Sequence, residues 1–295
     1  MKNILTLICL TIVLVACQKE IEFKGNAKAN VLVLNGVVEN DSVFRIFLER
    51  SSFFLSNEVG GANEVSSGAE VKLTNLTSGE VFTLTQSTVG NRYDFPFVTT
   101  PNTRFKIEVS HPSYPSISSE MTTTSKVNLA AVDSVTVVKN QENRLKITFN
   151  WNDPSEENYY MVRIKQDVSA PDYEYTEFLY MESTDPSIDN SNNTDIDGSV
   201  YAVNTYLFDD KKFNGQQKEI EFLCYYYNPN TDPFNPATEN IYCQLITMDK
   251  ATYLYYKSAS ANANSDFFSE PVKVLSNIEN GFGIFGTLNY SVKKL

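Results

Sequence analysis

The most restrictive feature of this 295-residue chain is the repeated alternation of apolar and polar residues in short runs. A period of two places one face of a β-strand in a core and the other in water. Six such runs lie at 31–38, 43–49, 69–76, 80–85, 91–95 and 104–109. Up to residue 125 no segment has a convincing helical period, so this part is predicted to be a β-sandwich.

A Thr/Ser-rich segment, 118–125, is interpreted as a link to a second unit. Strand-like runs follow at 131–137, 144–151 and 159–165. A strand carrying Trp151, a turn at Asp153-Pro154 and a tyrosine-bearing strand resemble the first half of a fibronectin type III sandwich, with the tryptophan expected in the core. Residues 249–263 place aromatic side chains at helical spacing, which predicts one helix on this unit.

The predicted fold class is therefore all-β, with two β-sandwich domains. Residues 68–109 resemble prealbumin-like or carboxypeptidase-regulatory-like domains, which implies an architecture for the first sandwich but no activity. The predicted boundaries are 29–125 for this Ig-like or prealbumin-like sandwich and 126–295 for a fibronectin type III-like sandwich with insertions and one short helix.

The start of the chain indicates export and lipid anchoring. An apolar run, 4–16, is too short to span a bilayer and ends in small residues, which is typical of a cleaved signal peptide. It ends in the lipobox Leu14-Val15-Ala16-Cys17. We therefore expect residues 1–16 to be removed and Cys17 to be lipidated, because acyl chains at that position would hold a soluble domain on a membrane.

The predicted lipidated tether, 17–28, contains a second localisation signal. Residues 18–22, Gln-Lys-Glu-Ile-Glu, resemble the signal that directs Bacteroidota lipoproteins to the outer face of the outer membrane. The expected location is therefore the outer membrane, lipid-anchored and facing the cell surface. An ordinary polar tether of the same composition is the alternative.

Charge argues against some partners. The chain has 24 Lys and Arg against 36 Asp and Glu, a formal net charge of −12. Its basic residues cluster no further than the pairs Lys211-Lys212 and Lys293-Lys294. Binding of nucleic acid, or of an anionic membrane through a basic face, is therefore not expected.

Two cysteines, Cys224 and Cys243, would remain in the mature chain beside Cys17. They lie in the strand-like runs 219–227 and 240–248, separated by a turn-rich segment. If these runs pair as antiparallel neighbours, the cysteines lie nearly opposite each other, and an exported protein permits a disulfide. Two free buried thiols fit the sequence equally well.

Motifs for catalysis are sparse. The chain has one histidine, His111, in a segment without a nucleophile elbow, and no phosphate-binding or dinucleotide motif. We expect no enzyme activity and no organic cofactor. A hydrolase built on paired carboxylates is a third-ranked alternative, because pairing in space is not visible in a sequence.

One segment has a mild calcium signal. Asn193, Asp195 and Asp197 offer oxygen ligands at alternate positions before a glycine, as calcium loops do. The twelfth position is Asn204, where such loops carry a bidentate glutamate. An Asx-rich surface loop is the alternative, because Asn and Asp also favour turns.

Three consecutive tyrosines, Tyr225, Tyr226 and Tyr227, are the candidate binding aromatics. Successive side chains of a strand point to opposite faces, so one face of the triplet can be accessible. An exposed tyrosine suits a glycan, a peptide or a protein, because it offers a flat apolar ring and a hydroxyl. Packing in the core is the alternative.

The C-terminal region carries the most specific pattern, Glu270-Pro271-Val272, then Asn277-Ile278, then 280–286, Asn-Gly-Phe-Gly-Ile-Phe-Gly. Together with Phe208-Asp209-Asp210, Phe213-Asn214-Gly215 and the lipobox, it resembles the Bacteroidota lipoprotein family called domain of unknown function 4249. We interpret the glycines of 280–286 as a tight turn that presses aromatic side chains into the core.

The resemblance implies a role. It covers nearly the whole mature chain, and its members are typically encoded beside TonB-dependent outer-membrane receptors. This implies an accessory subunit of nutrient import that binds the receptor, or a small nutrient, glycan or peptide, and it supplies no catalytic residues. A structural or adhesive envelope lipoprotein without a transport role is the second hypothesis.

Overall fold

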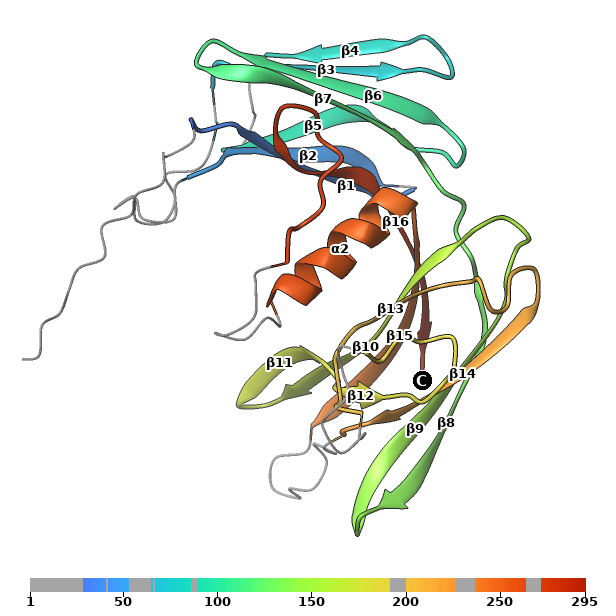
Figure 1. Cartoon of the computed structure of the whole chain (residues 1–295). Helices are drawn as coiled ribbons and strands as arrows, with labels where there is room; N and C mark the ends of the chain where they lie inside the picture. Colours follow the sequence, from blue (N-terminus) through green and yellow to red (C-terminus); the bar gives the residue numbers. More distant parts are fainter. Residues whose placement is uncertain are drawn as a thin grey trace, which may run out of the picture.

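The computed structural model describes residues 29–40, 42–52, 65, 67–85, 90–191, 200–226, 237–263 and 272–295. Over these residues the fold is all-β with one helix, as the sequence predicts (Figure 1). Within the same ranges, no helix is long and apolar enough to cross a membrane. The predicted signal peptide, Cys17 and the tether lie outside the described residues.

The strands form two groups along the chain. The first group is β1 (Leu32–Val38), β2 (Val43–Arg50), β3 (Glu70–Asn75), β4 (Val81–Leu84), β5 (Arg92–Val98), β6 (Arg104–His111) and β7 (Tyr114–Thr122). The second is β8 (Leu129–Lys139), β9 (Glu142–Asn152), β10 (Tyr159–Ala170), β11 (Tyr173–Phe178), β12 (Met181–Glu182), β13 (Tyr206–Asp209), β14 (Gln217–Cys224) and β15 (Thr238–Met248). Helix α2 (Lys250–Ala263) and β16 (Phe282–Lys294) follow. All six strands predicted before residue 110 are present.

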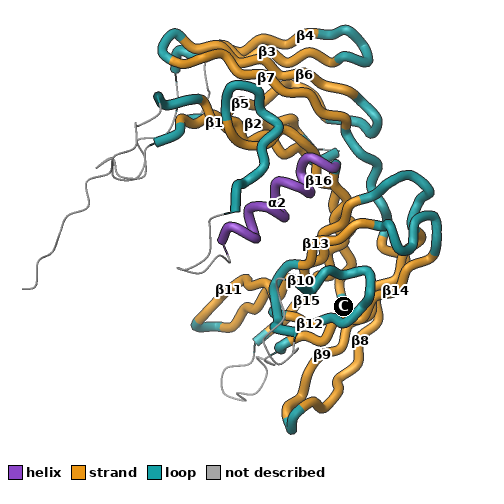
Figure 2. The backbone as a smooth tube through the Cα atoms, viewed as in Figure 1, coloured by secondary structure: helices purple, strands orange, loops and turns teal. Residues whose placement is uncertain are grey.

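One long sheet runs through the whole molecule (Figure 2). Its order is β11-β10-β15-β16-β1-β2-β5, and β13 also pairs with β10. A four-stranded sheet, β4-β3-β6-β7, faces one end of the long sheet, and a second, β12-β14-β9-β8, faces the other end. Two sandwiches therefore share one continuous sheet.

Strand β16 joins the two sandwiches. Its first half, Phe282–Thr287, pairs parallel with β1, and its second half, Leu288–Lys294, pairs antiparallel with β15. The chain therefore returns to the first sandwich at its end. The predicted division at residue 125 places all of β16 in the second sandwich and does not include this return.

The first core is aromatic. Alternate residues of β1 are buried, which is the expected result of a two-residue period on a sheet with one face in the core. Phe44 lies at the centre, with its ring centroid 5.2 Å from that of Phe105, 5.5 Å from that of Phe95 and 6.0 Å from that of Phe285. Because Phe285 belongs to β16, the last strand completes this core.

The second core surrounds Trp151, which is fully buried, as predicted. Its ring lies 5.6 Å from Tyr160, 5.9 Å from Phe213 and 6.3 Å from Phe208 between centroids. Such contacts add about 0.5–1.5 kcal/mol each beyond area burial.

Two turns beside this core are joined by buried carboxylates. Asp210 accepts a hydrogen bond of 2.6 Å from the backbone N–H of Asn158, and Asp153 accepts one of 2.9 Å from that of Gly215. The hydroxyl of Tyr160 also donates to Asp153. Burial raises the pKa of both carboxyl groups. The short motifs around Asp210 and Gly215 therefore have a structural role.

The predicted tight turn at 280–286 is wrong from Phe282 onward, because that part is the start of β16. The expected burial of aromatic side chains is confirmed for Phe285, whereas Phe282 is exposed. Gly283 has φ of +109°, and a Cβ there would lie 2.0 Å from the carbonyl oxygen of Leu34. A Cβ on Gly286 would lie 2.0 Å from Thr252 Oγ1. The glycines therefore let β16 approach β1 on one side and α2 on the other.

The interpretation of 118–125 as a link is also wrong over its first half, because β7 extends to Thr122. Ile117, Ser119 and Met121 are buried at alternate positions. The positions between them, Ser118, Glu120 and Thr122, are polar and more exposed, and one serine, Ser119, takes a core-facing position where an apolar residue is expected. The Thr/Ser-rich composition of this segment therefore gave no sign of the alternating burial that β7 has.

Helix α2 forms as predicted and packs on the outer face of the shared sheet, against β16 and β10. Asp249 caps it. Its Oδ1 accepts from the N–H of Thr252 at 3.0 Å, and its Oδ2 accepts from Thr252 Oγ1 at 2.7 Å and from the N–H of Thr287 at 2.6 Å. One carboxylate therefore starts the helix and fixes it to β16.

Removing this cap should weaken the fold. We expect Asp249→Ala to lower the free energy of unfolding by about 2 kcal/mol, because it removes an N-cap and leaves the buried N–H of Thr287 without its acceptor. Asp249→Asn keeps an acceptor oxygen and should lose less. Urea denaturation followed by circular dichroism measures both, and equal losses in the two variants would contradict this account of the cap.

Candidate binding site

A cleft of about 580 Å³ lies between α2 and the segment that joins β12 to β13. This volume is in the range of small-molecule and peptide sites. Its lining includes two tyrosines, Tyr180 and Tyr201, and a facing pair of charges, Asp189 and Lys257. Ser260 follows Lys257 on the same face of α2.

The side of the cleft that carries Tyr180 and Tyr201 is held in place by backbone pairing. Met181 and Val203 exchange two backbone hydrogen bonds of 2.9 Å, which fixes the chain next to Tyr180 and Tyr201. Buried Tyr206 supports the bridge, because its hydroxyl accepts from the N–H of Ser183 at 3.1 Å. The two lining tyrosines remain exposed, Tyr180 by 56% and Tyr201 by 48%. The backbone is fixed, and about half of each tyrosine stays exposed to solvent.

The charged wall is an exposed ion pair. Lys257 Nζ lies 3.6 Å from Asp189 Oδ2 and 3.4 Å from the hydroxyl of Tyr253. Hydrogen bonds from Ser191, with the charge of Lys257 added, hold the pKa of Asp189 below its ordinary value. Partial burial lowers the pKa of Lys257, but Tyr253 and Asp189 outweigh it and the pKa is raised. Both groups are therefore charged at neutral pH.

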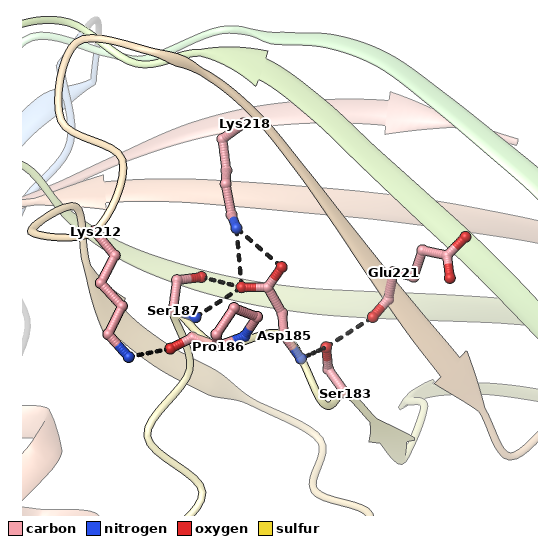
Figure 3. Close-up of polar contacts among 7 residues, drawn as sticks. All are labelled: Ser183, Asp185, Pro186, Ser187, Lys212, Lys218 and Glu221. Atoms are coloured by element: carbon pink, nitrogen blue, oxygen red, sulfur yellow. Dashed lines mark hydrogen bonds and ion pairs between the residues drawn. The ribbon is translucent and has the colours of Figure 1, made fainter.

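A largely buried ion pair, Asp185–Lys218, anchors the loop that carries Asp189 (Figure 3). Both carboxylate oxygens of Asp185 lie 2.9 Å from Lys218 Nζ on β14, and the two side chains are only 15% and 13% exposed. The N–H of Ser187 donates to Asp185 at 2.8 Å, and its hydroxyl donates to the same oxygen. These hydrogen bonds and Lys218 outweigh burial and lower the pKa of Asp185.

Further contacts in Figure 3 fix the ends of this loop. Ser183 Oγ donates to the carbonyl oxygen of Glu221 at 2.7 Å, and Lys212 Nζ donates to that of Pro186. The ammonium of Lys218 also lies 5.2 Å from the ring centre of Phe213. The loop is thus held against β14 from Ser183 to Ser187, which positions Asp189 opposite α2.

This arrangement is suited to binding. An exposed ion pair contributes only about 0–1 kcal/mol, so a ligand that supplies a better partner can replace it at small cost. Exposed tyrosine rings offer stacking faces with hydroxyl groups at their edges. In the described part of the chain, no group of three or more His, Cys, Asp or Glu side chains could hold a metal ion.

The predicted aromatic cluster lies elsewhere. The hydroxyl of Tyr225 donates to Glu182 at 2.6 Å, and the guanidinium of Arg144 lies 3.8 Å from the centre of its ring. The hydroxyl of half-buried Tyr226 donates to Glu239 at 2.7 Å. Tyr227, like the predicted calcium ligands Asn193, Asp195 and Asp197, lies outside the described residues. Tyr226 is half-buried and Tyr225 is 41% exposed, so a binding role for Tyr225 stays a prediction.

The single histidine is also away from the cleft. His111 Nδ1 accepts from the N–H of Ser113 at 3.0 Å, and Nε2 lies 3.3 Å from the carbonyl oxygen of Ser67. Its ring lies 4.8 Å from that of Tyr114 between centroids. It therefore supports the end of β6.

Cys224 and Cys243 are free thiols, both fully buried. The strand pairing that a disulfide would need does not form, because β14 pairs with β9 and β12 while β15 pairs with β10 and β16. Of the two alternatives that the sequence left open, the structure has the free buried thiols. The two cysteines belong to opposite sheets of the second core. Burial raises the pKa of Cys224 and raises that of Cys243 to about 12.

These thiols should be inert in the folded protein. A thiol reagent such as DTNB reacts with the thiolate, so we expect no reaction of Cys224 or Cys243 under native conditions. Unfolding in guanidinium without a reductant should expose both. Variants that carry only one of the two cysteines assign the signal, and a failure to detect thiols after unfolding would indicate a disulfide instead.

Comparison with known proteins assigns the chain to a family. No curated protein matches it. A family model described as Domain of unknown function (DUF4249) matches residues 18–294, nearly the whole chain after the predicted signal peptide. The glycines that bring β16 against β1 and the carboxylates that join the two turns lie within this match. The chain therefore belongs to the DUF4249 family.

Proposed function

We propose that this protein is a surface-exposed, lipid-anchored outer-membrane protein that acts as a binding accessory of a TonB-dependent nutrient import receptor. The observation that carries the proposal is the cleft beside α2, where Tyr180 and Tyr201 face the Lys257–Asp189 ion pair. The lipobox at Cys17 and the family assignment support it.

The cleft fits a protein segment of the receptor. A loop that carries an aromatic residue beside a charged one could stack on Tyr201 and replace one partner of the exposed ion pair. The loop of this protein that carries Asp189 is held in place by the Asp185–Lys218 pair, which lowers the entropy cost of ordering it on association. A glycan or peptide nutrient offers similar chemistry and is the second candidate ligand.

Anchoring would strengthen this contact. Acyl chains at Cys17 restrict the protein to the plane of the membrane that holds the receptor. The short tether, 17–28, then keeps the effective concentration of the cleft high beside its partner, so a modest intrinsic affinity is sufficient.

Co-purification tests the proposal. The full chain is isolated from membranes through a C-terminal tag in mild detergent, and bound proteins are identified by mass spectrometry. We expect a stoichiometric TonB-dependent receptor with the wild type and with Tyr173→Ala, an exposed tyrosine of β11 that does not line the cleft. The double variant Tyr180→Ala, Tyr201→Ala should lose it.

Two outcomes would contradict the proposal. Recovery of abundant lipoprotein without a receptor would favour a free-standing binder or an envelope protein. Retention of the receptor by the double variant would show that the contact lies outside the cleft.

A further inference from the structure

Strand β8 is an open edge of the second sandwich. It forms one end of its four-stranded sheet, and among the described strands its backbone ladder joins it only to β9 (Figure 1). The β8–β9 hairpin closes through Asn140 and Gln141, which have φ of 54° and 67°. Such a two-residue turn makes Lys139 and Glu142 a hydrogen-bonded pair. Odd-numbered residues from Asp133 onward therefore bond to β9, and even-numbered ones point their backbone groups outward.

This edge is longer than the other described edges and has no proline. Proline, exposed charge and short length normally keep an edge strand from pairing with another chain. The other described edges carry them: Pro96 in β5, Pro115 in β7, Glu174 and Glu177 in β11, and lengths of four, two and four residues in β4, β12 and β13. Strand β8 has 11 residues without proline, and Val135 and Val138 are exposed by 51% and 74%. Its two charges, Asp133 and Lys139, have opposite signs, unlike the two glutamates of β11.

The charges on β8 fit a second copy of the same strand. In an antiparallel pair centred on Thr136, Asp133 of each copy lies opposite Lys139 of the other. Val135 lies opposite Val137, and Ser134 lies opposite Val138. The outward backbone groups of the even-numbered residues then face each other in the hydrogen-bonded positions, as an antiparallel ladder requires.

Local charge does not oppose this contact. The chain as a whole carries a net charge of −12. The hairpin itself is nearly neutral, with Asp133 and Glu142 against Lys139, Arg144 and Lys146. Lys139 lies 2.5 Å from Glu182, so Asp133 of the second copy would extend an existing ion pair into a network.

We propose that two copies of this protein associate through their β8 edges, as a two-fold symmetric dimer with Thr136 on the axis. The contact is isologous, because each copy presents the same residues to the other. It merges the two β12-β14-β9-β8 sheets into one. The cleft beside α2 lies on other elements, so the dimer and the proposed receptor contact are independent.

Disulfide trapping tests the register directly in the full chain, in membranes of the expressing cell. Thr136→Cys should give a covalent dimer on mild oxidation, because hydrogen-bonded partners have Cα atoms about 5.5 Å apart, within disulfide range. Ser134→Cys is the matched control. Residue 134 also lies on β8 and is exposed. In this register, however, residue 134 of the other copy is displaced by about 13 Å along the strand, too far for a disulfide.

The double variant Ser134→Cys, Val138→Cys completes the test, because these residues lie opposite each other and should cross-link. The wild type gives the background from Cys17, Cys224 and Cys243. Dimer formation by Thr136→Cys and by the double variant, at several times the Ser134→Cys level, is the expected result. Equal cross-linking of the two single variants, or none in any variant, would overturn the proposal. If the disulfide cross-link forms but no receptor co-purifies with the protein, the dimer stands and only the proposed receptor contact is contradicted.

Discussion

Replacing Gly283 with alanine is expected to prevent the protein from folding. A Cβ at this position would lie 2.0 Å from the carbonyl oxygen of Leu34, and φ of +109° is a conformation that L-residues rarely adopt. The obstacle is the backbone of β1, which cannot turn away as a side chain could. Because β16 belongs to both sandwiches, the loss should exceed about 4 kcal/mol and abolish cooperative unfolding.

Gly79→Ala is the control for this substitution. Gly79 also has a positive φ, of 80°, but no atom lies within 4 Å of the position of an added Cβ. It should therefore cost only the local strain of about 1–2 kcal/mol. Circular dichroism and urea denaturation compare the two variants, and a Gly283→Ala protein as stable as Gly79→Ala would contradict the described approach of β16 to β1.

Breaking the buried pair beneath the cleft should give the second large effect. Lys218→Met leaves the carboxylate of Asp185 without its cation in a site where the two side chains are 13% and 15% exposed. Removing one partner of a buried pair typically costs about 3–5 kcal/mol. Since both groups keep some solvent contact, we expect a loss of about 3 kcal/mol in the free energy of unfolding.

This loss should depend on pH. The folded pKa of Asp185 is below its ordinary value, so its contribution is present above the unfolded pKa and is lost as pH falls through the folded pKa. The gap between the wild type and Lys218→Met should therefore begin to shrink below about pH 4, where the unfolded carboxyl takes up a proton, and shrink further as pH falls through the lower folded pKa. Urea titrations at pH 7 and pH 3.5 measure it.

Lys146→Met is the matched control for Lys218→Met. Lys146 pairs with Glu221 at 2.7 Å in the same four-stranded sheet, but the two side chains are 33% and 56% exposed. An exposed pair contributes about 0–1 kcal/mol. Similar losses in the two variants would show that burial does not set the strength of the Asp185–Lys218 pair.

Local patterns predicted most of the strands for a physical reason. In the first sandwich most strands have one face in the core and one toward water, so runs such as 69–76 and 104–109 alternate in sequence. Strand β16 has no such period, because α2 and the cores cover both of its faces and successive residues are buried. Its parallel partner, β1, lies about 250 residues earlier, a distance that no local pattern encodes.

The cleft could not be predicted because its residues are distant in sequence. Tyr180, Tyr201 and Lys257 come from three separate elements, and an isolated tyrosine in a loop carries no signal of its own. Lys257 was visible only as part of a helical spacing. The conspicuous tyrosines at 225 and 226 satisfy their hydroxyls with Glu182 and Glu239 instead.

We expect the cleft beside α2 to contact an import receptor. Photo-crosslinking in living cells tests it most directly, with a photoreactive amino acid at Tyr201 and, as a control, at Val81, an exposed residue of β4 in the other sandwich. We expect that position 201 cross-links to one TonB-dependent receptor and that position 81 does not. Absence of a receptor adduct at position 201, or the same adduct from both positions, would contradict it.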